Sequence, residues 1–271
     1  MSIVRTALTA LLIVSIPSVS GATPAWQQEG LDAPADLGPL VTDRPDATES
    51  PETVGKGRFQ LEAGYTFASF EQADVHSLGE LLLRIGVLHE NFELRLGFNS
   101  FSVVRDGDFD AKGLQNFGIG VKFRLLSGGG VGHARPTVAV LVSTTLPTAN
   151  EAIEARTARP DVRLALAWDF SDRVSFGTNL IWTSIKEDEL AERHSALGLT
   201  LAMGYGLSDR WGAYFEYFGA FPTGEHDPEN YLNGGVTYLI SNDLQLDGRV
   251  GYGLNGRDDD FFVGFGTAVR W

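Results

Sequence analysis

Hydrolytic chemistry is the first possibility that this sequence raises, because it contains both histidines and serines. A serine hydrolase needs a serine nucleophile with a histidine in hydrogen-bond reach. His194 precedes Ser195, but neighbouring residues of a strand point to opposite faces. No triad spacing is recognisable, so we expect loop, turn and strand-end histidines in water, and no enzyme. The five histidines are His76, His89, His133, His194 and His226.

Metal and phosphate sites also find little support. Residues 258–260 are three consecutive aspartates, but they lack the glycine turn and the spaced ligands of a calcium loop. The glycines at 128–130 lack the lysine and the helix of a phosphate-binding loop. There is no cysteine, and the net charge of −14 argues against nucleic-acid binding. We therefore expect no cofactor, no metal ion and no nucleic-acid partner.

The other chemistry-bearing residues are charged side chains that recur with a period of two. In residues 58–67, Arg58 and Glu62 share one face, and Phe59, Leu61 and Tyr65 share the other. This alternation is typical of strands with two unlike faces. Twelve such segments are predicted: residues 58–67, 80–87, 92–99, 116–124, 138–146, 162–170, 174–182, 197–205, 211–217, 232–240, 244–254 and 261–271.

The polar faces of these segments carry seven acids and eight bases, whereas the apolar faces carry no charge. Because an isolated charge on a low-dielectric wall is costly, these near-equal numbers predict internal pairing. The paired charges either brace the wall or line a path, and the two roles are compatible. The charges are Glu62, Glu80, Glu93, Asp161, Asp169, Glu216 and Asp247, with Arg58, Arg84, Arg95, Lys122, Arg124, Arg163, Arg249 and Arg270.

Two all-β architectures alternate in this way. A soluble sandwich places its charges in outside water, and it has no need for the small residues that fill the polar face of 196–206. A transmembrane barrel places its apolar face outward and its polar face toward a confined lumen. The connections favour a transmembrane antiparallel barrel of about twelve strands. They are mostly short at 89–91, 126–135, 171–173, 208–210 and 241–243, but longer and acidic at 71–77, 105–114, 147–160, 185–194, 222–230 and 255–260.

Both ends of the chain fit an exported barrel. Arg5, an apolar run and small residues at 20–22 are typical of a cleaved signal peptide. The alternative is a membrane anchor, but the run is far shorter than the ~20 residues of a spanning helix. The last strand ends on Trp271, an aromatic terminus that we expect to act as an assembly signal. The predicted organisation is a signal peptide at 1–22, an extended segment at 23–56 and the barrel at 57–271.

The residues that precede the first strand resemble a known family. The motifs are TDRPD at 42–46, TESP at 48–51 and GRFQLEAGY at 57–65. They resemble the start of a family of outer-membrane transporters named for the meta pathway of phenol degradation. The resemblance implies an outer-membrane barrel that transports small molecules, with aromatic or hydrophobic compounds as its substrates.

The stretch TDRPDATESP at 42–51 is charged and cannot fold alone. We predict that it folds back into the periplasmic mouth as a plug or gate; a disordered leader is the alternative. Arg44 would pair with Glu62 and Asp247, and the aspartates with Arg84, Arg95 and Arg249. The predicted lumen and gating residues are Asp43, Arg44, Asp46, Glu62, Arg84, Glu93, Arg95, Glu216, Asp247 and Arg249.

The sequence thus predicts a narrow outer-membrane channel with a charged lumen. Two alternatives stay open. One is a structural or surface protein of the outer membrane whose acidic loops bind a partner or divalent ions, and the other is an outer-membrane lipid hydrolase. The expected partners are outer-membrane lipid and lipopolysaccharide, the barrel-assembly machinery and a small-molecule substrate.

Overall fold

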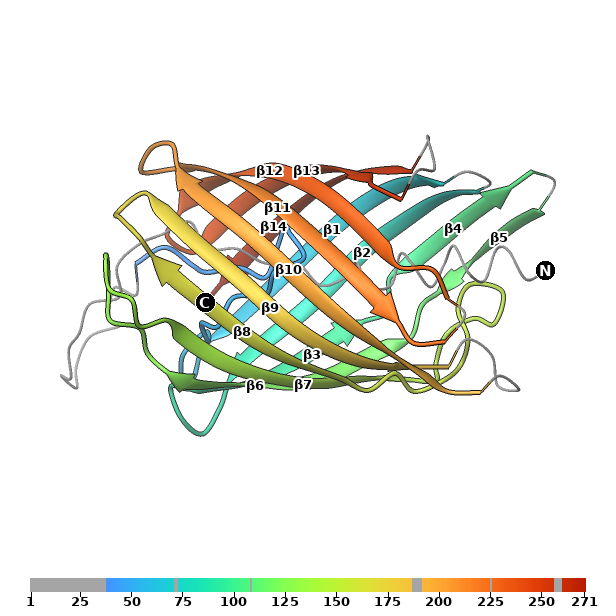
Figure 1. Cartoon of the computed structure of the whole chain (residues 1–271), viewed down its shortest axis with the longest axis horizontal. Coiled ribbons are helices and arrows are strands. Elements are labelled where there is room, and N and C mark those ends of the chain that lie inside the picture. Colours follow the sequence, from blue (N-terminus) through green and yellow to red (C-terminus); the bar gives the residue numbers. More distant parts are fainter. Residues whose placement is uncertain (1–37, 71–72, 108, 187–191, 225, 256–259) are drawn as a thin grey trace.

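The chain folds into one antiparallel sheet that closes on itself as a barrel (Figure 1). The computed structural model describes residues 38–70, 73–107, 109–186, 192–224, 226–255 and 260–271. The predicted signal peptide and the start of the extended segment lie outside these residues. Within them, β1 pairs with both β14 and β2, which closes the ring. No helix in the described part is long and apolar enough to cross a membrane.

Fourteen strands are assigned within the described residues. They are β1 (Phe59–Phe70), β2 (Ala73–Gly86), β3 (Phe92–Phe98), β4 (Phe101–Asp106), β5 (Phe109–Leu114), β6 (Phe117–Leu126), β7 (Thr137–Leu146), β8 (Asp161–Asp169), β9 (Val174–Ile185), β10 (His194–Gly206), β11 (Trp211–Pro222), β12 (Glu229–Ser241), β13 (Leu244–Gly253) and β14 (Phe261–Arg270).

Twelve of these strands close the ring in the described chain, as the sequence predicted. The other two, β4 and β5, form a hairpin that prolongs β3 and β6. Along one edge, β2 pairs with β4 in its first half and with β3 in its second half. On their other edges, β4 pairs with β5 and β3 pairs with β6. Strands β3 and β4 form one interrupted strand, and β5 and β6 form another. The two interruptions lie at the same level, where Gln115 N–H donates to Ser100 O at 2.9 Å.

Two of the predicted long loops are corrected by this hairpin. Residues 105–114 were expected to be a loop, but β4 and β5 occupy most of that range. Residues 71–77 were expected to be another, but β2 already begins at Ala73. Both ranges are polar and acidic, which is typical of loops. In the structure they are strands, because pairing with neighbouring strands satisfies their backbone N–H and C=O groups.

The two faces of the wall follow the predicted alternation. On β11, Phe215 is 59% exposed and the next residue, Glu216, is fully buried. On β13, Val250 is 59% exposed and Arg249 is 5% exposed. Apolar side chains therefore cover the outside of the barrel, and charged ones turn inward. This is the arrangement of a barrel whose outer face contacts lipid.

A bulge in β2 changes which residues face inward. The register with β1 shifts between Glu62 and Gly64. Gly79 and Glu80 adopt positive φ angles of 98° and 41° at that point. Beyond it Val75 is fully buried and Leu78 is 43% exposed. A bulge re-aims side chains, and this one turns Leu78 outward and Val75 inward, while Glu80 keeps the inward position that alternation predicts.

The barrel encloses part of its own N-terminal chain. Residues 40–56, here called the inner segment, lie within the wall, and residues 42–51 are all buried. Figure 1 shows this segment in blue, between the strands and toward the end of the barrel that holds the C-terminus. The predicted extended segment thus runs inside the barrel over its described part.

The outward and inward positions of β7 can be compared at adjacent residues. Val142 is 47% exposed on the outer face, and Ser143 lines the internal cavity. Arginine at an outward midplane position costs roughly 2–4 kcal/mol. We expect Val142→Arg to reduce the folded fraction in lipid vesicles, as measured by heat-modifiable gel migration. Ser143→Arg is the matched control and should fold better; the opposite order would contradict this assignment of faces.

Candidate functional site

The inner segment enters and leaves the lumen at the end with the short turns. Leu40 N–H donates to Asn242 O at 2.7 Å, beside the β12–β13 turn. The returning leg reaches the β2–β3 turn, where Thr53 Oγ1 donates to Glu90 O at 2.6 Å. Between these points the segment reaches Glu216, in the middle of β11. The segment is therefore a loop whose two legs both lie at the short-turn end and whose tip reaches about mid-barrel.

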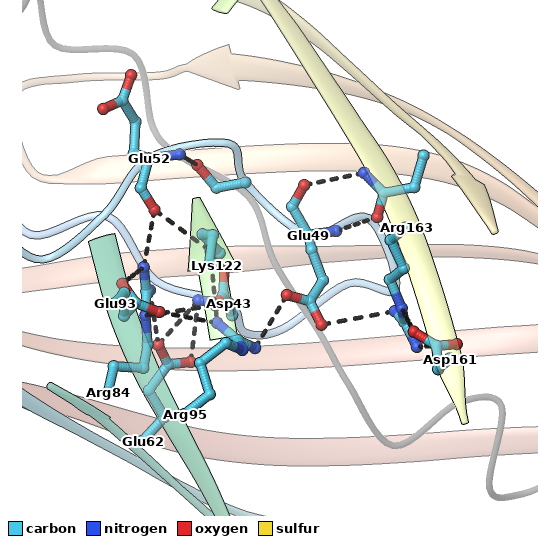
Figure 2. A network of polar contacts seen from close by, with 12 residues as sticks. Asp43, Glu49, Glu52, Glu62, Arg84, Glu93, Arg95, Lys122, Asp161 and Arg163 are labelled. Atoms are coloured by element: carbon cyan, nitrogen blue, oxygen red, sulfur yellow. Dashed lines mark hydrogen bonds and ion pairs between the residues drawn. The ribbon is translucent and has the colours of Figure 1, made fainter. Parts of the chain in front are cut away.

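The first anchor of the loop is the carboxylate of Asp43 (Figure 2). It accepts hydrogen bonds from Lys122 Nζ at 3.1 Å on both oxygens and from Arg95. Arg84 Nε lies 3.4 Å away. Arg84 also pairs with Glu62 at 3.1 Å and Glu93 at 2.9 Å. The three bases therefore face three acids, one of which comes from the inner segment.

The electrostatics of Asp43 follow from this cluster. Asp43 belongs to the inner segment and not to a spanning strand. Burial opposes its charged form, but Arg84, Lys122 and Arg95 outweigh burial and hold the pKa of its carboxyl far below the usual range. Asp43 is therefore an anion at any physiological pH, and it stays paired.

Arg84 also joins the two legs of the loop. Its Nη1 donates to Val41 O at 2.9 Å, and its Nη2 donates to Glu52 O at 2.9 Å. On the wall side, both oxygens of Glu62 accept from Asp43 N–H at 2.9 Å. One buried guanidinium thus fixes the entering and the returning chain at once.

Arg44 forms a second anchor on the opposite side of the segment. It donates to Glu80 at 2.6 Å and to Asp247 at 3.4 Å. Its guanidinium fills a slot between β1 and β14, where a Cβ on Gly64 or Gly266 would come within 2.2 Å of it. The wall therefore has glycine at these positions because a side chain would occupy the place of Arg44.

The tip of the loop crosses to β9, β10 and β11. Ala47 N–H donates to Glu216 at 2.8 Å, and Thr48 Oγ1 lies 2.8 Å from Thr200 Oγ1. Glu49 N–H donates to Asn179 Oδ1 at 2.7 Å, and Asn179 donates back to Glu49 O at 2.9 Å. The backbone of the tip is therefore bonded to the wall through neutral and acidic side chains.

A cavity of about 190 Å³ adjoins the tip on the side of the long connections. Ala47 and Glu49 form part of its lining, together with small wall residues such as Gly118, Ser143 and Gly198. Phe218 also lines it. The inner segment thus separates this cavity from the short-turn end of the lumen.

One side of the lumen near the long connections carries a buried apolar cluster, which the alternation did not predict. Phe218 stacks on Tyr231 with centroids 4.9 Å apart, and Phe262 lies 6.2 Å from Tyr231. Arg249 lies 5.3 Å from the centroid of Phe262 and donates to Pro45 O at 2.9 Å. The buried cluster around these rings includes Ala47, Ala68, Ala73, Val75, Val104, Ala111, Ile153, Phe218, Tyr231 and Phe262.

The predicted lumen residues all turn inward. All are buried: Asp43, Arg44, Asp46, Glu62, Arg84, Glu93, Arg95, Glu216, Asp247 and Arg249. The partners differ in part from the expected ones, since Arg44 pairs with Glu80 and not with Glu62. Trp271 lies apart from this site, 54% exposed, with its ring stacked on Phe59 at the β1–β14 seam.

Several residues of the site were not singled out from the sequence. Lys122, Asp161 and Arg163 were placed on polar faces, but their depth in the barrel could not be read from alternation. Glu49 and Glu52 lie in or just beyond the TESP motif, but nothing in it identifies their partners. Glu49 pairs with Arg95 and Arg163, and Glu52 with Arg124.

The histidines do not lie at this site. His194 and His226 stack on each other with centroids 4.2 Å apart, and Tyr65 is hydrogen-bonded to His76 at 2.8 Å. None of these three histidines lines the cavity. Among the described residues, no group of three or more histidines or acids is arranged to hold a metal ion.

Comparison with known proteins identifies similar folds. Residues 42–271 match the family described as "Putative MetA-pathway of phenol degradation". An outer membrane channel from Pseudomonas putida F1 is similar, with a TM-score of 0.63, 15% identity, and 81% of this chain and 97% of that chain covered. The NanC porin has a TM-score of 0.52, 13% identity, and coverage of 78% and 98%. No curated protein sequence matches the chain.

The Asp43 cluster predicts a measurable stability difference. Asp43→Asn would remove the acid that contacts all three buried bases, and breaking a buried pair costs about 3–5 kcal/mol. We expect a loss of this size in the free energy of unfolding, measured by urea titration in lipid vesicles. The control is Glu52→Gln, whose side chain is 30% exposed, with a cost of about 1 kcal/mol or less. Equal losses in the two variants would contradict the role of Asp43 as an anchor.

Proposed function

The chain belongs to the family described as "Putative MetA-pathway of phenol degradation", and from this premise we propose that it is an outer-membrane channel for small molecules, gated by the inner segment. The observation that carries the proposal is the buried loop itself. Its tip separates a cavity from the short-turn end of the lumen. A loop in this place must move for a solute to pass.

Aromatic or hydrophobic solutes fit the long-connection side of the lumen. Phe218 lines the cavity there, stacked on Tyr231 and backed by the tilted ring of Phe262. A cavity of about 190 Å³ lies below the about 300–1,000 Å³ of pockets for drug-sized ligands. Its size therefore suits single-ring compounds. We propose a non-catalytic role, consistent with the channel and the porin that share the fold.

The outer face and the C-terminus support the proposed location and partners. Exposed apolar residues such as Phe265, at 60% exposure, would contact outer-membrane lipid, with lipopolysaccharide at the long-connection end. Trp271 closes the seam, because its N–H donates to Phe59 O at 2.9 Å and its carbonyl accepts from Phe59 N–H at 3.0 Å. We assign Trp271 the role of the signal that the barrel-assembly machinery reads.

The gate is tested by removing it. Deletion of residues 42–50 should raise the single-channel conductance in planar bilayers, because the lumen loses the loop that crosses it. Arg44→Ala should change conductance in the same direction by a smaller amount. Arg156→Ala is the control, since Arg156 forms an exposed pair with Glu151 in a connection. Unchanged conductance in a folded deletion variant would contradict the gate.

A reversible version keeps the loop in place. The chain has no cysteine, and the hydroxyl oxygens of Thr48 and Thr200 lie 2.8 Å apart. Thr48→Cys combined with Thr200→Cys should form a disulfide that ties the tip to β10. We expect solute flux into liposomes to fall on oxidation and to recover with a reductant. Equal flux in both states would show that the tip does not move during transport.

The assembly role of Trp271 is tested separately. Deleting Trp271 should leave export intact but lower the amount of barrel in the outer membrane, because the seam loses an aromatic contact and two backbone hydrogen bonds. Membrane fractionation with heat-modifiable gels measures this. Trp271→Phe should retain most of the level. A normal level after deletion would remove the assigned role.

A further inference from the structure

The carboxylate of Glu49 lies at the floor of the cavity, between two arginines (Figure 2). Its Oε2 is 2.9 Å from Arg95 Nη2, and its Oε1 is 3.5 Å from Arg163 Nη1. Arg95 comes from β3 and Arg163 from β8, and both also line the cavity. A solute that descends from the long-connection end therefore meets a carboxylate that is already held by two guanidinium groups.

The carboxylate of Glu49 has fewer hydrogen bonds than that of Asp43. Asp43 accepts hydrogen bonds from both Lys122 and Arg95. Glu49 is only 2% exposed, yet its Oε2 has no hydrogen-bond partner among the described residues. An ion pair without hydrogen bonds forgoes much of the energy available to a charge-assisted contact. The side chain of Glu49 can therefore be exchanged for a better-placed carboxylate while Asp43 stays anchored.

The two arginines would each lose an acidic contact if Glu49 left. Arg163 already pairs with Asp161 at 2.8 Å, and Arg95 pairs with Glu93 at 3.0 Å and with Asp43. Loss of Glu49 would still remove an acid from both, which is costly in a buried site. A carboxylate on a solute can take over the contacts with both arginines, whereas a neutral solute of the same shape forms no ion pair with them.

We propose that Arg95 and Arg163 are the recognition site for the carboxylate of small aromatic acids, and that Glu49 occupies this site as a built-in substitute when the channel is closed. The inference rests on the proposed channel function and names its substrate class. The solute carboxylate replaces that of Glu49 on the two arginines. Its ring lies against the apolar cavity wall, where Phe218 is one of the lining residues. Displacement of Glu49 frees the tip to move.

The test compares one acid with a neutral analogue of similar shape. Benzoate and benzyl alcohol are supplied to liposomes that contain the full-length channel at pH 7, and the ratio of their fluxes is measured. Glu49→Gln removes the competing charge but keeps the backbone bonds to Asn179. It should raise the benzoate to benzyl alcohol ratio by about three- to ten-fold, the net effect of one ordinary hydrogen bond.

Two further variants complete the test. Arg163→Gln should lower the ratio below the unmodified value, and Arg163→Lys should restore part of it. Glu151→Gln is the control, because it removes the same charge from an exposed side chain of a long connection. It should leave the ratio unchanged. Calorimetric titration of benzoate into the detergent-solubilised channel should show tighter binding with Glu49→Gln and weaker binding with Arg163→Gln.

The outcomes separate the two proposals. If Glu49→Gln raises both fluxes equally, or if the ratio and the benzoate affinity are unchanged in every variant, the carboxylate site is overturned while the channel stands. If no solute passes through the folded protein, even after deletion of residues 42–50, the channel function itself fails. If benzoate still bound more tightly to Glu49→Gln and more weakly to Arg163→Gln, the carboxylate site would be supported without the channel function.

Discussion

The structure depends on the pairing of charges inside a wall that faces lipid on its other side. Arg84, Arg95 and Lys122 form a cluster of three bases, and the strands offer it two acids, Glu62 and Glu93. The third acid is Asp43, on the inner segment. Because a buried charge without a partner is expensive, the wall is incomplete without the segment. The segment, in turn, has only a few apolar residues, such as Leu40, Ala47 and Val54, which are too few to build a fold of their own. Each therefore stabilises the other.

The same constraint explains irregular features of the wall. Glycine at 64 and 266 leaves room for the guanidinium of Arg44, and a Cβ on Gly86 would come within 1.6 Å of the backbone oxygen of Gly55 on the returning leg. Glu80 has a positive φ of 41° at the bulge of β2, an unfavourable backbone for a residue with a side chain. At this position its carboxylate forms an ion pair with Arg44. Glycines and a bulge thus shape the lumen around one particular chain.

Much of the fold, but only part of the site, follows from the sequence. Alternation identifies the inward position of Glu216 and the outward position of Phe215, because side-chain direction is a local property of a strand. Register is not local, so the depth of Lys122 and its distance from Asp43 could not be derived. The bulge at Gly79 reverses the faces of the first half of β2. Alternation continued from the second half of the strand would therefore place Leu78 inside, whereas it lies outside. The hairpin of β4 and β5 was missed because polar strands beyond the apolar band read as loops.

The lumen has two chemical regions, and the inner segment lies at their boundary. Toward the short turns the contacts are charged and carry many hydrogen bonds, as for Asp43 and Arg84. Toward the long connections one side of the lumen carries the rings of Phe218, Tyr231 and Phe262. Glu49, at the boundary, has ion pairs but an oxygen without a hydrogen bond. The carboxylate of Glu49, which faces the cavity, therefore has fewer hydrogen bonds than that of Asp43 at the base of the loop. Under the proposed function, opening requires displacement of the tip around residues 46–50, while Asp43 and Arg44 keep the segment attached to the wall.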